Sequence, residues 1–278
     1  MKAAILSLLF ERYPLEEMFR CVSALGYDGL DLYGARPIAY TYDMDAERIN
    51  EVLRLAKKYR LEIPMYTPEL LAYPYNVSTN DRDERRATTE YLIHSVNTAS
   101  RLNIPRMLVG CGHAGYGTDR KTNFENIYAT LEPVVAEAEK LGVTLILEAL
   151  TVMESNTVVF ADDVKEVLTH FNSPRLRTML DTVTPPANRE SFSHFFHLLK
   201  DDIDYIHFVD GNGVDESHML LGTGMIDLRA LAHQLRDTGY DGWLCVEIMG
   251  RYIMDPATYA ERELRKLKEI FAPWEEKR

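Results

Sequence analysis

The sequence predicts an α/β protein with the fold of a (β/α)8 TIM barrel, and three observations support this. Short β-rich runs alternate with longer segments that carry apolar residues at helical spacing, from one end of the 278-residue chain to the other. Eight such pairs give about 35 residues per unit, near the usual size of a unit in this barrel. No linker, low-complexity tract or change of composition divides the chain, so residues 1–278 are expected to form a single domain. An open doubly wound sheet is the alternative, but no Gly-rich phosphate loop follows the first β-rich run.

The first strand needs its own justification, because its apolar residues imitate a signal peptide. The apolar stretch runs only from Ala3 to Phe10, Glu11 and Arg12 follow directly, and no small-residue cleavage site is present. A strand is therefore expected there. From their β-rich composition, the strands in order are expected at 3–9, 28–33, 62–66, 106–110, 143–148, 176–181, 203–209 and 242–248.

The helices are expected where apolar residues recur every three or four positions and leave the other face polar. Asp45 and Asn123 stand where N-terminal caps belong, and Gly26, Gly142 and Gly239 follow helix ends, where a left-handed conformation favours glycine. The helices in order are expected at 15–25, 45–60, 83–102, 124–141, 161–171, 189–200, 227–238 and 257–271.

Composition and charge exclude several classes of protein. Lys and Arg number 31 and Asp and Glu number 43, so the formal net charge is −12, and no basic run offsets it. Such a chain repels a phosphate backbone, which argues against a nucleic acid as partner. No apolar stretch is long enough to cross a bilayer, so no membrane partner is expected. Cys21, Cys111 and Cys245 lie far apart inside apolar runs, which is typical of reduced core residues in a cytoplasmic protein.

Four ionisable residues stand at the C-terminal ends of the last four expected strands: Glu148, Asp181, His207 and Glu247. In a barrel these strand ends form the mouth where the chemistry takes place. Because side chains alternate along a strand, Glu148 shares a face with Ile146 and lies opposite Leu145 and Leu147. The bulky aliphatic faces are expected to pack on the helices. The ionisable side chains therefore point into the mouth.

Three carboxylates and an imidazole in a partly buried mouth would repel one another without a cation. A hard divalent ion satisfies a set of oxygen ligands with one histidine nitrogen, so the sequence predicts one ion of Mn²⁺, Mg²⁺ or Co²⁺, and Zn²⁺ also fits. The alternative is that these carboxylates cap loops or pair with arginines. The same inward parity on separate strands favours the metal.

Five further residues near the strand ends are candidates for substrate binding: Glu154, His113, Glu69, His218 and Tyr66. Glu154 follows Glu148 by six residues, so a loop could return it to the mouth. His113 lies after the fourth strand among glycines that allow close backbone approach. Each of the five is either a substrate contact or an ordinary loop residue, and His218 could also be a metal ligand.

Nine short motifs, in a fixed order over nearly the whole chain, carry a family resemblance. They are Gly-Tyr-Asp-Gly-Leu-Asp-Leu (26–32), Tyr-Thr-Pro-Glu (66–69), Tyr-Pro-Tyr-Asn (73–76), His-Ala-Gly-Tyr (113–116), Leu-Ile-Leu-Glu (145–148), Glu-Ser-Asn (154–156), His-Phe-Val-Asp (207–210), His-Met-Leu-Leu-Gly-Thr-Gly (218–224) and Val-Glu (246–247). With them the chain resembles the sugar isomerase/epimerase superfamily, whose members share a xylose-isomerase-like barrel. Within it the chain is most similar to the fructoselysine 3-epimerases, and next to the ketose 3-epimerases of the tagatose and psicose type.

The resemblance implies a metal-dependent epimerase that inverts C3 of a ketose or ketose conjugate, with a small sugar as partner. It implies that Glu148, Asp181, His207 and Glu247 hold one metal ion. It also implies that Glu148 and Glu247 are the acid/base pair and that Glu154 holds the substrate. Self-association of the chain is left open.

One departure from the family pattern bears on the substrate. Ketose 3-epimerases often place a histidine three residues after the metal-binding aspartate and an arginine shortly after the metal-binding histidine. Here those positions are Thr184 and, approximately, Gly213. This departure favours a conjugated ketose over a plain one.

The expected chemistry is removal of a proton next to a carbonyl, with an enediolate intermediate whose charge a divalent ion stabilises. One glutamate takes the proton and the other returns one to the opposite face. Four alternatives remain on this scaffold. They are an aldose–ketose isomerase, an inosose dehydratase, a multi-zinc apurinic-site endonuclease with His113, His218 and Glu216 as relics of its extra ligands, and a sugar-binding barrel without catalysis.

Overall fold

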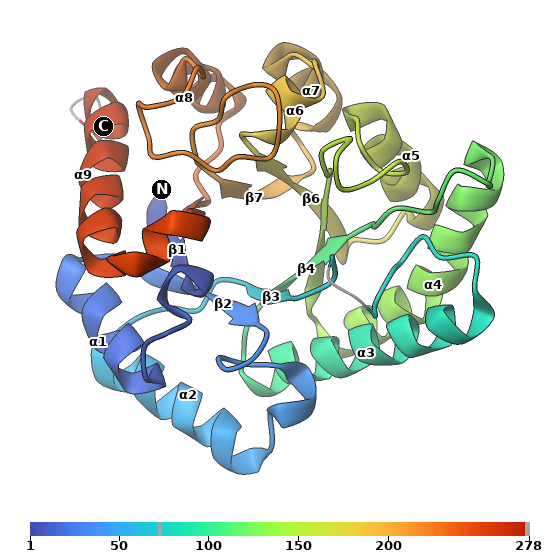
Figure 1. The fold of residues 1–278 in the computed structure, drawn as a ribbon, viewed down its shortest axis with the longest axis horizontal. Coiled ribbons are helices and arrows are strands. Elements are labelled where there is room, and N and C mark those ends of the chain that lie inside the picture. The colour runs from blue at the N-terminus through green and yellow to red at the C-terminus, as the bar shows by residue number, and fades with distance from the viewer. Residues whose placement is uncertain (72–73, 276–278) are drawn as a thin grey trace.

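The structure is a computed structural model that describes residues 1–71 and 74–275, and it has the barrel that the sequence predicts. Eight parallel strands close into a barrel in chain order, with β1 beside β8, and the helices surround it (Figure 1). The strands are β1 (Lys2–Leu6), β2 (Gly29–Gly34), β3 (Tyr66–Pro68), β4 (Arg106–Gly110), β5 (Thr144–Glu148), β6 (Leu176–Asp181), β7 (Ile203–His207) and β8 (Trp243–Val246). Ala72 and Tyr73, the latter part of the motif at 73–76, lie outside the described residues.

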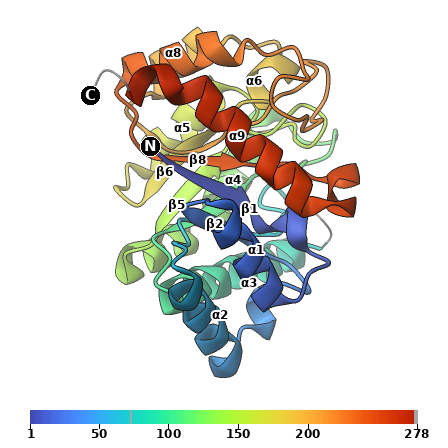
Figure 2. The same cartoon turned by 90° about the vertical axis from the view of Figure 1, so that its left-hand side faces the viewer.

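The α-helices lie between the strands, with a last one after β8. They are α1 (Leu15–Leu25), α2 (Ala46–Tyr59), α3 (Arg82–Arg101), α4 (Arg120–Leu141), α5 (Ala161–Phe171), α6 (Thr184–Ala187), α7 (Phe192–Leu199), α8 (Leu228–Thr238) and α9 (Pro256–Glu275). Short 3-10 helices are η1 (Ser7–Phe10), η2 (Thr41–Asp43) and η3 (Gly250–Met254). Helix α9 runs beside α1 and α8 and completes the ring (Figure 2). No described helix is long and apolar enough to span a membrane.

Three expected boundaries differ from the structure. The strand expected at 62–66 lies at Tyr66–Pro68, because Pro64 has no N–H for the ladder and Glu62 forms only an isolated bridge. The first strand ends at Leu6, and the chain turns into η1. The helix expected at 189–200 is α7, preceded by the short α6, since Arg189 between them has a left-handed backbone (φ 58°).

Most of the expected helix caps are present. The Asp45 carboxylate accepts a hydrogen bond from the Arg48 N–H at 2.8 Å, and glycine follows α1, α4 and α8 with positive φ. The expected cap at Asn123 is wrong. Helix α4 begins three residues earlier, where the Asp119 carboxylate accepts from the Thr122 N–H at 3.0 Å. Because that first turn is polar, its sequence carries no apolar period.

The apolar core has two parts that follow the alternation of side chains. One part lies between the strands and the helices and contains Leu145 and Leu147. The other fills the barrel and contains Ile146. The residues of the interior cluster are Ala4, Leu6, Met65, Leu108, Ile146, Met179, Tyr205, Trp243 and Cys245. The inward parity expected for β5 is therefore present, and the interior cluster forms a packed floor under the barrel mouth.

We predict that Ile146→Ala lowers the free energy of unfolding by about 2–5 kcal/mol, because the fully buried side chain leaves a cavity in the barrel floor. Denaturant unfolding measures the change. The control is Lys121→Ala on the exposed surface of α4, which should stay within about 0.5 kcal/mol of the unmodified protein. Equal stability of both variants would contradict a packed interior.

Candidate metal centre and active site

The structure brings together the four residues that the sequence places at the last four strand ends. Glu148, Asp181 and His207 are the final residues of β5, β6 and β7, and Glu247 directly follows β8. Each offers one ligand atom, and these atoms all lie within 4.8 Å of one another. The parallel register places Asp181 opposite His207 and His207 opposite Cys245, which aligns the strand ends at one level. We call these four residues the metal cluster.

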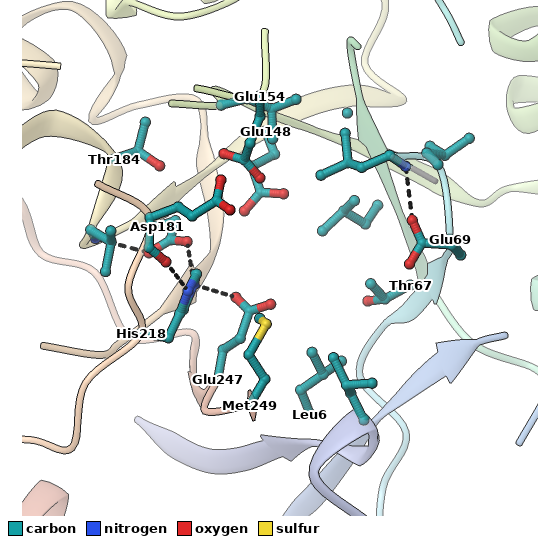
Figure 3. Close-up of a pocket in the computed structure, with 18 of the residues that line it drawn as sticks. Leu6, Thr67, Glu69, Glu148, Glu154, Asp181, Thr184, His218, Glu247 and Met249 are labelled. Carbon is teal, nitrogen blue, oxygen red and sulfur yellow. Dashed lines mark hydrogen bonds and ion pairs between the residues drawn. The ribbon is translucent and has the colours of Figure 1, made fainter. Parts of the chain in front are cut away.

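The metal cluster forms the bottom of an open cavity of about 210 Å³ at the barrel mouth (Figure 3). Leu6, Leu108 and Met249 contribute to an apolar wall. The polar part of the lining consists mainly of carboxylates from separate loops and strands: Glu69, Glu148, Glu154, Asp181, Glu216 and Glu247. None of the described lining residues is a lysine or an arginine.

The two ring nitrogens of His207 face different partners. Nδ1 is buried, has no hydrogen-bond partner among the described residues, and lies 2.5 Å from Glu247 Oε2 and 3.8 Å from Glu148 Oε1. Nε2 lies 3.5 Å from Oδ2 of the buried Asp31. Burial alone would lower the pKa of His207, but the Glu247 carboxylate and the contact with Asp31 outweigh it and raise the pKa well above its ordinary value.

The two glutamates of the metal cluster have opposite electrostatic environments. Burial raises the pKa of Glu148 well above its ordinary value, and the carboxylates of Glu247 and Asp181 add to the effect against the attraction of His207. Burial also opposes ionisation of Glu247, but the imidazoles of His207 and His218 outweigh it and lower its pKa. Without a cation, the pair therefore favours one protonated and one ionised glutamate.

The donor set fits a divalent metal ion. It offers three carboxylates and one imidazole, and the unpartnered Nδ1 of His207 points toward two of those carboxylates. A lone pair facing carboxylate oxygens at such distances is satisfied by a proton or by a cation between them. Mostly oxygen ligands with one nitrogen suit Mn²⁺, Mg²⁺ or Co²⁺, and Zn²⁺ accepts the same set.

Three of the five residues expected to bind substrate line the cavity. The Glu154 carboxylate accepts from the N–H and the hydroxyl of Thr151, at 3.0 and 2.9 Å. Glu69 accepts from the Tyr33 hydroxyl and from a backbone N–H. His218 Nε2 lies 3.1 Å from Asp181 Oδ2 and 3.4 Å from Glu247 Oε2, so it belongs directly beside the metal cluster.

The other two, Tyr66 and His113, lie outside the cavity lining. Because Met65 points into the barrel, Tyr66 points outward, and its hydroxyl donates to the Ala39 carbonyl at 2.7 Å. The ring of His113 accepts from the Gly115 N–H at 2.9 Å. The structure thus gives Tyr66 a packing role and makes His113 a loop residue, which corrects both expectations.

Asp31 and Thr67 were missed by reading only the last four strands. Asp31 is fully buried on β2 between Leu30 and Leu32, whose side chains join the outer core. The alternation that identified Glu148 would have placed Asp31 inward as well. Thr67 on β3 gave no such signal, since a threonine is common in strands.

The loop that carries His218 is fixed by a single buried carboxylate. Asp210 accepts hydrogen bonds from the backbone N–H groups of Gly211, Gly222, Gly224 and Ile226, at 2.8–3.1 Å. A Cβ on Gly224 would lie 2.3 Å from the Asp210 carboxylate and 2.4 Å from a backbone oxygen, so only glycine fits there. The loop after β5 is held similarly by the side-chain amide of Asn188, which bonds the Leu150 and Val159 carbonyls.

Comparisons with known proteins point in one direction. Residues 19–270 match a family described as the xylose isomerase-like TIM barrel. The chain is 34% identical over 270 residues to proteins named fructoselysine 3-epimerase from Shigella flexneri and from Escherichia coli O157:H7, covering 97% of this chain and 98% of each relative.

Solved structures show the same fold at lower identity. A D-tagatose 3-epimerase-like protein superposes with a TM-score of 0.86 at 20% identity, covering 100% of this chain and 99% of the other. D-psicose 3-epimerase from Clostridium cellulolyticum H10 gives a TM-score of 0.83 at 19% identity, covering 97% and 99%. A 3-keto-D-glucoside 4-epimerase from E. coli gives 0.80 at 17% identity, also covering 97% and 99%.

We predict that His207→Ala strongly weakens the binding of Mn²⁺ to metal-free protein, since it removes the nitrogen ligand from the cluster. Calorimetric titration with Mn²⁺ measures the affinity. The control is His197→Ala on the exposed side of α7, which should bind as the unmodified protein does. Equal losses in both variants would indicate damage to the fold and contradict the assignment.

We also predict that Mn²⁺ binding weakens as the pH falls from 8 to 6. The raised pKa of His207 means that the metal-free protein holds a proton on this ring at neutral pH, and a metal ligand must release it. One released proton corresponds to about a tenfold loss of affinity per pH unit below that pKa. Titrations in buffers of different pH test this, and an affinity independent of pH would contradict it.

Proposed function

The chain belongs to the xylose isomerase-like TIM barrel family, and on that premise we propose that it is a metal-dependent epimerase that inverts C3 of a ketose conjugate. The observation that carries the proposal is the metal cluster, in which two glutamates from different strands, β5 and β8, meet at one divalent-ion site. The curated relatives, 34% identical over nearly their whole length, are named as 3-epimerases. The chain is accordingly an enzyme of the isomerase class.

We propose that Glu148, Asp181, His207 and Glu247 hold the ion. When bound, a divalent ion supplies Lewis-acid stabilisation for the negative charge that develops as the C3 proton leaves. Glu148 and Glu247 are the acid/base pair, each serving one face of the enediolate. Their opposite pKa shifts suit this work, because inversion needs one group that can accept a proton and one that can give one.

The cavity supports a substrate that carries a positive charge. Beyond the metal cluster, three more carboxylates line it, from Glu69, Glu154 and Glu216, and the described lining has no lysine or arginine to neutralise them. A divalent ion leaves this surplus of negative charge in place. An ammonium group on a ketose conjugate complements the surplus, and the name fructoselysine given to the relatives' substrate describes such a compound. Thr184, which also lines the cavity, offers the sugar a hydroxyl group.

Two observations separate this proposal from the alternatives on the same scaffold. A three-zinc endonuclease site would need further ligands near the cluster, but His113 lies outside the cavity lining and its Nδ1 is used by the Gly115 N–H. The acidic cavity also repels a phosphate backbone. An aldose–ketose isomerase, an inosose dehydratase and a binding protein differ in which substrate carbon exchanges hydrogen. We also propose a reducing, cytoplasmic location, since Cys21, Cys111 and Cys245 are free thiols.

We predict that Glu148→Gln and Glu247→Gln each stop net epimerisation while some metal remains bound. Glutamine keeps an oxygen for the ion but cannot accept a proton, and inversion needs both faces. The variant that retains the base on the proton-bearing face should still exchange that hydrogen with solvent, so exchange should depend on which epimer is supplied. NMR of each variant with each epimer in D₂O measures this. An unchanged epimerisation rate in either variant would refute the two-base assignment.

We predict that Glu216→Gln raises KM roughly two- to fivefold for a ketose conjugate with an ammonium group and leaves KM for a neutral ketose unchanged, since a partly exposed ion pair is worth little. Steady-state kinetics with fructoselysine and with psicose measure the difference. Glu125→Gln, on the outer surface of α4, is the control and should change neither value. A similar KM change for both substrates would contradict recognition of the charge.

A further inference from the structure

Asp31 lies beneath the metal cluster, inside the barrel, and is fully buried. Its neighbours Leu30 and Leu32 point outward into the outer core, so the Asp31 carboxylate points inward from β2. Burying an ionisable carboxylate is costly unless its oxygens are hydrogen-bonded or paired with charge. The groups around those oxygens therefore indicate what the residue does.

Three side chains from three other strands surround the carboxylate. Oδ1 accepts a hydrogen bond from the Thr67 hydroxyl at 2.6 Å. Oδ2 lies 3.5 Å from His207 Nε2 and 3.9 Å from the Cys245 thiol. A thiol is a weak donor, so the strong partner of Oδ2 is the histidine ring.

The direction of the His207 ring gives this contact its consequence. Nε2 faces Asp31, on the side away from the cavity, and Nδ1 faces Glu148 and Glu247. In a neutral imidazole only one nitrogen carries the proton, and the hydrogen bond of one nitrogen decides which. A carboxylate can only accept, so it holds the proton on Nε2 and leaves the Nδ1 lone pair free for a metal ion. Within the described part of the chain, Nδ1 has no competing hydrogen bond.

We propose that Asp31 is a positioning residue that fixes His207 in the tautomer and orientation required for metal binding through Nδ1. Thr67 holds the other oxygen of the carboxylate and so fixes its direction. Asp31 itself does not touch the ion, because His207 lies between them. The inference rests on the metal site of the proposed function, and it concerns affinity for the ion rather than the identity of the sugar.

The test compares the affinity of metal-free proteins for Mn²⁺ by calorimetric titration. Asp31→Asn should lower the affinity about 10- to 100-fold, the usual effect of losing a partner that orients a metal ligand. The asparagine amide can offer N–H to Nε2, which favours the wrong tautomer. Two controls match its burial. Cys245→Ala removes the weak neighbour of the same oxygen, and Asp163→Asn changes a buried carboxylate that caps α5 away from the cluster. Both should bind Mn²⁺ as the unmodified protein does.

A spectroscopic readout separates positioning from loss of packing. In the Zn²⁺-loaded protein, long-range ¹H–¹⁵N spectra of the histidine rings should show the His207 proton on Nε2, and this signal should be lost or changed in Asp31→Asn. If that variant does not fold, Thr67→Val, which leaves the carboxylate in place but frees one oxygen, should show a smaller loss of affinity.

Three outcomes would overturn the proposal. In the first, folded Asp31→Asn binds Mn²⁺ as tightly as the unmodified protein. In the second, the two control variants lose as much affinity as Asp31→Asn. In the third, the loaded protein carries the His207 proton on Nδ1. Any of these results would leave the proposed epimerase intact as long as the unmodified protein binds the ion, whereas failure of that protein to bind any divalent ion would contradict the metal site as well.

Discussion

The structure of the site depends on one electrostatic constraint, the meeting of three carboxylates and an imidazole at the ends of four adjacent strands. The ligand atoms lie within 4.8 Å of one another and are largely shielded from water, so their mutual repulsion cannot be relieved by solvent. In the metal-free chain, protons on His207, His218 and Glu148 relieve it, as their raised pKa values indicate. A divalent ion does the same with charge to spare, and it exchanges those protons for a site that can stabilise an anion.

The barrel and its loops hold the site at different levels. The strand register aligns the metal cluster, and the interior cluster below it gives a rigid floor. Above it, Asp210 and Asn188 satisfy backbone groups of two loops, which fixes residues that no strand supports, such as His218 and Glu154. Between the two levels, Asp31 connects β2 to His207 on β7. The ligands are thus oriented by strands, and the substrate contacts by hydrogen-bonded loops.

The fold and the metal cluster could be predicted from sequence because both follow from periodic patterns. Alternation of side chains is local, so one strand suffices to say that Glu148 points inward. Tyr66 shows the limit of this reasoning, since the strand began later than its apolar run because of Pro64, and a shift of the boundary changes which residues reach the cavity. His113 shows another limit. Loop residues have no period, and only tertiary contacts such as the Gly115 N–H decide where the ring points. Asp31 was readable by the same parity but lies on a strand outside the four that were compared.

The central claim is that this site removes and replaces the hydrogen on C3 of a ketose with the help of one bound divalent ion. NMR of a ketose conjugate incubated with the Mn²⁺-treated enzyme in D₂O, followed by removal of the ion, tests it most directly. The account predicts that deuterium enters at C3 alone, that both C3 epimers accumulate with the label, and that a chelator stops both. Label at C1 or C2 would indicate an aldose–ketose isomerase instead. Full-rate epimerisation after the ion has been removed would contradict the account.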